Sequence, residues 1–153
     1  MSMSKKKRKR LNARSSNADI RRKAKNREER KVKEELPLMI FSFKDFQYNN
    51  QIPPGQTYEE WQEKELLAYM LTKFGYICNM NRIEAEQQKY IKVYGNFPPN
   101  SEFTNPFSDV EDLQWAVIMN IKGQKPRVAG HVIGHVFYVV FLDMEHQFYP
   151  SSR

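Results

Sequence analysis

The sequence predicts an α+β fold in which an amphipathic helix packs on a mostly antiparallel sheet that ends in a C-terminal strand meander. Three observations support this fold class. One segment has apolar residues at helical spacing, the last third alternates short apolar runs with short turns, and a basic arm precedes both. We therefore expect an arm over residues 1–35 and one folded domain over residues 36–153.

The arm is defined by its charge. Residues 1–35 contain fifteen Lys and Arg against five Asp and Glu, a net charge of +10, whereas residues 36–153 contain ten and thirteen, a net charge of −3. This asymmetry indicates a polyanionic partner for the arm. Residues 19–35 are rich in Arg, Lys, Glu and Ala, which favour a helix that is partial when free, and Pro37 ends it.

The first predicted strand covers residues 38–46, which are apolar and aromatic, and a loop follows over residues 47–56. Thr57 and Glu60 have the capping-box spacing, so we expect a helix from about residue 58 to residue 74, ended by Gly75. Its apolar face consists of Trp61, Leu66, Leu67, Met70, Leu71 and Phe74.

The second half of the chain is predicted to be mainly strands. Residues 97–109 form a long loop rich in proline and polar residues. Short connections between the later strands favour antiparallel neighbours. The predicted elements are a short helix at 82–89 and strands at 90–94, 115–121, 127–133, 136–142 and 147–149.

Several function classes are disfavoured by composition and motifs. Cys78 is the only cysteine, so no intramolecular disulfide can form, and we expect a cytoplasmic protein, or a nuclear one in a eukaryote. Cys78 also lacks a cationic or helix-start setting that would make it a nucleophile. No apolar run suggests a membrane span or a signal peptide. There is no P-loop, GxGxxG, GxSxG or CxxC motif, and we expect no cofactor.

The arm is predicted to hold nucleic acid, with RNA or a ribonucleoprotein such as the ribosome preferred. A dense row of cations releases counterions from phosphates, which gives salt-sensitive, sequence-independent binding. A nuclear import signal, a solubility tail and an anionic membrane patch are the alternatives, and the lack of apolar residues between the charges speaks against the membrane. The candidate nucleic-acid-binding residues are Lys5, Lys6, Lys7, Arg8, Lys9, Arg10, Arg14, Arg21, Arg22 and Lys23.

The three histidines, His131, His135 and His146, all lie within the strand meander. Two of them could bind a metal together with Asp143 or Glu145, or they could act as general acid and base in RNA cleavage. They could equally be partly exposed polar residues at strand ends. No HExxH motif is present, so we predict no metal site.

A basic turn and two tyrosines complete the candidates. Lys122, Lys125 and Arg127 surround the first turn of the meander and could hold a phosphate or stabilise a developing charge, or be ordinary solvated residues. Tyr138 and Tyr149 could each stack on a base, or pack in the core or at the sheet edge.

The C-terminal segment resembles the ending of uncharacterised proteins carried by bacterial mobile elements. The resemblance extends over residues 38–149. The residues that carry it are Arg127–Gly130, Val136–Asp143, His146, Phe148 and Tyr149, together with Phe41–Asp45 and Thr57–Trp61.

The order of elements is also similar, more distantly, to that of RelE/ParE-type toxins, small domains with helices followed by an antiparallel sheet. Ribonucleases of that family cut messenger RNA in the ribosome with basic residues, a tyrosine or a histidine near the last strands. The resemblance implies a metal-independent endoribonuclease with Lys125, Arg127, His146 and Tyr149 at its site, although this domain is net acidic. A non-catalytic module, whose acidic domain binds a protein partner, is the third possibility.

Overall fold

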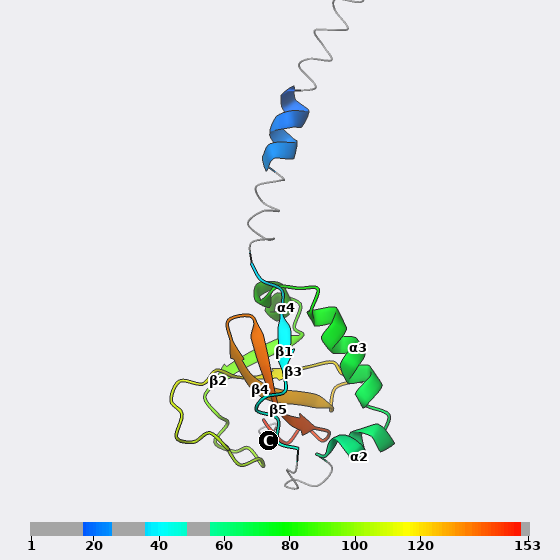
Figure 1. Cartoon of the computed structure of the whole chain (residues 1–153), viewed down its shortest axis with the longest axis vertical. Coiled ribbons are helices and arrows are strands. Elements are labelled where there is room, and N and C mark those ends of the chain that lie inside the picture. The colour runs from blue at the N-terminus through cyan, green and yellow to red at the C-terminus, as the bar shows by residue number, and fades with distance from the viewer. Residues whose placement is uncertain (1–16, 26–35, 49–55, 151–153) are drawn as a thin grey trace, which may run out of the picture. The chain divides into compact units, whose positions relative to one another are not determined.

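The computed structural model describes residues 17–25, 36–48 and 56–150. The chain divides into two compact units, Met1–Leu36 and Pro37–Arg153. In the first unit, residues 17–25 form a largely exposed helix, drawn in blue in Figure 1, in which Arg22 pairs with Asp19 one turn earlier. This helix falls partly within the predicted arm helix. Residues 26–35 of that prediction lie outside the described residues.

The second unit contains a five-stranded sheet in the order β1-β5-β4-β3-β2. β1 runs parallel to β5, and the other neighbouring strands are antiparallel. The predicted α+β fold with a C-terminal meander is therefore confirmed. The strands are β1 (Ile40–Ser42), β2 (Ile91–Gly95), β3 (Trp115–Ile118), β4 (Arg127–Ile133) and β5 (Val136–Asp143).

A bulge between Ala129 and Gly130 interrupts the pairing of β4 with β5. At this bulge the two backbones approach so closely that a Cβ on Gly130 would lie 1.9 Å from the carbonyl oxygen of Tyr138. Only glycine fits there. Before the bulge, the register places Arg127 opposite Asp143, which matters for the site described below.

The single helix predicted over residues 58–74 is wrong, because the structure has two helices there, α2 (Tyr58–Glu63) and α3 (Leu67–Ile77). Glu65 adopts a positive φ of 58°, and the Leu66 amide donates a hydrogen bond of 2.8 Å to the Trp61 carbonyl. A left-handed residue followed by such a backward bond ends a helix. Both Trp61 and Leu66 are buried, so core packing fixes the break.

The predicted start of the helical segment is confirmed, but its predicted end is not. The Thr57 hydroxyl accepts a hydrogen bond of 3.3 Å from the Glu60 amide, so the predicted N-cap is confirmed. By contrast, Gly75 does not end the second helix, which continues to Ile77. The predicted short helix at 82–89 is present as α4 (Arg82–Gln87).

Two predicted strands need correction. Within residues 38–46, only Ile40–Ser42 is a strand of the sheet. Residues 147–149 form no strand, because the Gln147 and Phe148 amides donate their hydrogen bonds to the Asp143 carboxylate instead of to a neighbouring strand.

The sheet has an apolar cluster on each face, made by alternate residues of β3, β4 and β5. Ala116 and Ile118 pack with Trp61 and Phe74 of the helices. Trp115, on the opposite face, packs in the second cluster with Val117, Phe103, Phe141 and Phe148. In Figure 1, α2 and α3 lie to one side of the sheet and the long loop after β2 lies to the other. The second face therefore carries loops and the C-terminal turn instead of helices.

Candidate functional site: a basic and aromatic cluster around Arg127

Three of the four predicted catalytic residues come together on the face of the sheet that the helices leave uncovered. Arg127 begins β4, and His146 and Tyr149 lie in the turn that follows β5. Lys92 and Tyr94 of β2 join them. These five residues, Lys92, Tyr94, Arg127, His146 and Tyr149, are linked by electrostatic and ring contacts and are called the Arg127 cluster below.

Arg127 is the central cation of the cluster. Its guanidinium acts electrostatically on Tyr94, Asp143 and His146. Its Nε–H is buried and has no acceptor among the described residues. Buried N–H groups in folded proteins almost always have a hydrogen-bond partner, and ordered water is a common one.

Two stacked tyrosine rings belong to the cluster. Tyr94 and Tyr149 are stacked, with centroids 4.2 Å apart and an interplanar angle of 10°, and the Lys92 ammonium lies 5.1 Å from the centroid of Tyr94. Burial raises the pKa of Tyr94, and the nearby Tyr149 adds to this, although Arg127 opposes it. The Tyr94 hydroxyl therefore keeps its proton at neutral pH and can donate a hydrogen bond.

His146 supplies a neutral imidazole to the same cluster. Its backbone has a positive φ of 59°, so the turn holds it in a conformation that few side chains other than glycine adopt. Partial burial lowers the pKa of His146, and the charges of Arg127 and Lys92 lower it further. At pH 7 the imidazole is therefore mainly neutral and can accept a proton.

Asp143 holds the turn that carries His146 and Tyr149. Its buried carboxylate accepts hydrogen bonds of 2.8 Å from the Gln147 amide and 2.8 Å from the Phe148 amide. Burial raises the pKa of Asp143 despite these bonds and the charge of Arg127. The carboxylate closes the turn, which buries Phe148 in the second apolar cluster. Asp143 is therefore a positioning residue.

Lys125, the fourth predicted catalytic residue, has a different contact. Its ammonium lies 3.2 Å from a carboxylate oxygen of Glu145, and both side chains are exposed. This ion pair joins Lys125 to Glu145 and to none of the five residues of the cluster. We therefore do not include Lys125 in the site.

His131 is also separate from the cluster. Its Nε2 lies 3.0 Å from the Asp45 carboxylate, and its buried ring stacks on Tyr138 at 4.7 Å. These contacts join β4 and β5 to the loop that follows β1. No group of three His, Cys, Asp or Glu suited to a metal occurs in residues 17–25, 36–48 and 56–150.

The predicted nucleic-acid-binding residues of the arm fall into two groups. Lys5–Arg10 and Arg14 lie outside the described residues. Arg21, Arg22 and Lys23 lie on the helix of residues 17–25 and are exposed. In this helix the Asp19 carboxylate already pairs with Arg22. Arg21 and Lys23 are thus exposed cations of the first unit, as binding to phosphates would require.

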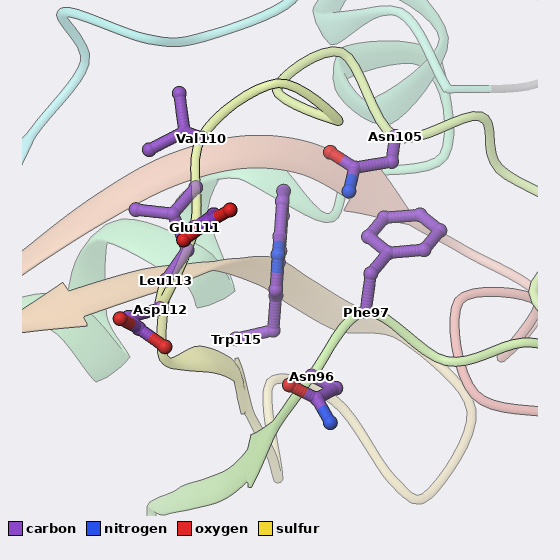
Figure 2. Close-up of a pocket in the computed structure, with 8 residues that line it drawn as sticks. All are labelled: Asn96, Phe97, Asn105, Val110, Glu111, Asp112, Leu113 and Trp115. Atoms are coloured by element: carbon purple, nitrogen blue, oxygen red, sulfur yellow. The ribbon is translucent and has the colours of Figure 1, made fainter.

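A pocket of about 300 Å³ lies on the loop that follows β2. In Figure 2 the Trp115 indole stands edge-on between Phe97 and Asn105 on one side and Val110 and Leu113 on the other. The pocket lining also includes the carboxylates of Glu111 and Asp112 and the amide of Asn96. These two carboxylates make the pocket lining negative, whereas the Arg127 cluster contains the cations Arg127 and Lys92.

Comparison with protein-family models, with curated proteins and with solved structures finds no match for this chain. Among the described residues, no helix is both long enough and apolar enough to cross a membrane. The functional argument below therefore depends on the geometry and electrostatics of the cluster.

Proposed function

We propose that this chain binds RNA and that the Arg127 cluster holds one phosphodiester group of the bound strand. The observation that carries the proposal is the convergence of the half-buried Arg127 with Tyr94, Tyr149 and His146 on one face of the sheet. Lys92 adds a second cation, and Tyr149, 40% exposed, offers a ring beside it. Single-stranded RNA provides both phosphates for the cations and unstacked bases for the ring.

The arm and the cluster contribute to binding in different ways. The arm carries a net charge of +10, which supports strong attraction to phosphates without sequence preference. The folded domain is net acidic, so only a local group of cations can hold a phosphate there. We assign most of the affinity to the arm and the orientation of the strand to the Arg127 cluster.

Replacing Arg127 tests this proposal. Arg127→Gln removes the central cation, so the affinity for a single-stranded RNA should fall about tenfold, the loss expected for a charge-assisted contact. Fluorescence anisotropy with a labelled oligonucleotide measures the change. Lys125→Gln is the matched control, because it removes the same charge nearby but outside the cluster, and its affinity should stay within about twofold. Equal losses in the two variants would mean that only net charge matters.

RNA cleavage is a second candidate function, favoured by the neutral state of His146. His146 would accept the proton of a ribose 2′-hydroxyl as that oxygen attacks the adjacent phosphorus. The bond from phosphorus to the 5′-oxygen breaks, and the leaving oxygen takes a proton from Tyr94. The products are a 2′,3′-cyclic phosphate and a 5′-hydroxyl. Arg127 would stabilise the negative charge that develops on the phosphate, as the resemblance to RelE-type toxins implies.

Cleavage predicts a specific dependence on pH. His146 must be neutral to act as the base, and its pKa is lowered from the ordinary value of 6.5. The cleavage rate should therefore increase with pH and reach its plateau before the pH reaches 6.5. His146→Ala should reduce the rate by about a hundredfold or more while RNA binding persists. Gel analysis of the 3′ ends measures both effects. If no cyclic phosphate forms at any pH, cleavage is excluded and the binding proposal stands.

A further inference from the structure

The structure points to a second RNA contact on the opposite side of the sheet, where α3 presents a row of tyrosines and lysines. This inference rests on the proposed function, because it extends the RNA strand that the Arg127 cluster would hold. The row consists of Tyr69, Lys73, Tyr76, Tyr90 and Lys122, and is called the tyrosine–lysine stripe below. We propose that single-stranded RNA runs along it, with bases on the tyrosine rings and phosphates on the lysines.

Helical spacing places the first three members on one face of α3. Tyr69, Lys73 and Tyr76 follow one another at intervals of four and three residues, so their side chains lie above one another. The buried face of the same helix is formed by other residues, namely Met70, Phe74 and Ile77. Tyr69 is 47% exposed and Tyr76 is 60% exposed. The helix thus presents two large aromatic rings to solvent beside a cation.

Lysines and tyrosine rings alternate along the stripe. The Lys122 ammonium lies 4.8 Å from the centroid of Tyr69, and the Lys73 ammonium lies 4.9 Å from the centroid of Tyr90. Tyr76 and Tyr90 are 6.3 Å apart between centroids. A lysine has a flexible four-carbon stem, so its ammonium can move from a ring to a phosphate and free the ring face for a base.

The charge of α3 fits a polyanion. Lys73 is the only charged residue between Leu67 and Ile77, so the helix has no carboxylate that would repel phosphates. Surfaces that bind single strands without strict sequence preference combine cations for the backbone with aromatic rings for successive bases. The tyrosine–lysine stripe has both, which favours nucleic acid over a protein partner.

The connection between β3 and β4 links the stripe to the Arg127 cluster along the chain. Lys122 lies in the connection between β3 and β4, and the chain reaches Arg127 five residues later, a span of at most about 17 Å. Tyr69 and Tyr76 are about 10 Å apart along the helix axis. At about 3.4 Å for each stacked nucleotide, one strand that covers both regions needs about eight nucleotides.

The test compares two lengths of RNA on the full chain. A single-stranded oligonucleotide of about four nucleotides is too short to cover both the Arg127 cluster and the stripe, whereas one of about twelve is long enough to cover both. The double variant Tyr69→Ala/Tyr76→Ala should bind the longer RNA at least about tenfold more weakly, since two rings that stack on bases are lost, and should bind the shorter one normally. Tyr69→Phe/Tyr76→Phe keeps the rings and should bind both lengths like the wild type.

Tyr58→Ala is the matched control, because Tyr58 is an exposed tyrosine of the neighbouring helix α2 outside the stripe. Circular dichroism checks that each variant is folded. Normal binding of the longer RNA by the double alanine variant would overturn the stripe and leave the Arg127 proposal intact. If the wild type bound neither RNA, the proposed function and the stripe would both be wrong.

Discussion

Asp143 illustrates how one buried residue determines the geometry of the whole cluster. Its carboxylate accepts two backbone hydrogen bonds, from Gln147 and Phe148, and so fixes the turn between β5 and Tyr149. Because it stands opposite Arg127 in the β4–β5 register, it also places the turn beside that cation. Asp143 thereby holds in place the turn that carries His146.

We expect Asp143→Ala to lower the free energy of unfolding by about 2 kcal/mol, because two buried amides lose their acceptor. Asp143→Asn keeps one acceptor and should cost less. Urea denaturation measures both variants.

The pH dependence of these unfolding energies follows from the raised pKa of Asp143. The folded state disfavours the charged carboxylate, so this group's contribution to stability is greatest below the unfolded pKa of about 3.9 and is lost as the pH rises through the folded pKa. The stability of the wild type relative to Asp143→Asn should therefore decline as the pH rises from 3. A constant difference would mean that Asp143 ionises as freely in the folded state as in the unfolded state.

The sequence led to part of the cluster for a physical reason. Arg127, His146 and Tyr149 flank the strands of a meander whose connections are short, so their proximity follows from local order. Lys92 and Tyr94 were not predicted, because they reach the cluster only through the position of β2 in the sheet. Their one signal was a spacing of two residues, which places both side chains on one face of a strand.

At the scale of elements, β4 was predicted with its observed bounds, Arg127–Ile133, because a short, mainly apolar segment lies between two clear turns. The break between α2 and α3 was missed. Apolar residues continue at helical spacing from Trp61 to Phe74, and the left-handed residue is Glu65 rather than glycine. A left-handed glutamate cannot be recognised in the sequence as a left-handed glycine can. Here the burial of Trp61 and Leu66 holds the backbone of Glu65 in that conformation.

The pairing of β1 with β5 also could not be predicted from the sequence. The paired residues Ile40 and Val136 are distant along the chain, and no local pattern specifies a parallel neighbour. β1 is shorter than the apolar run that predicted it. After β1, Phe43 packs on Phe46, and the Asp45 carboxylate lies within hydrogen-bonding distance of His131. These residues therefore form a loop packed on the domain and not a longer strand.

At the scale of the whole molecule, the separation of charge between arm and domain decides how RNA binding should respond to salt. The arm carries many cations and the domain few, so most of the salt dependence should come from residues 1–35.

The most direct measurement is the RNA affinity of a chain that lacks residues 1–35, with and without Arg127→Gln, over a series of salt concentrations. We predict weak binding that remains without the arm, that depends less steeply on salt than binding by the full chain, and that Arg127→Gln largely removes. A shortened chain that binds RNA equally well with either residue at position 127, or that binds none, would contradict a phosphodiester site at Arg127.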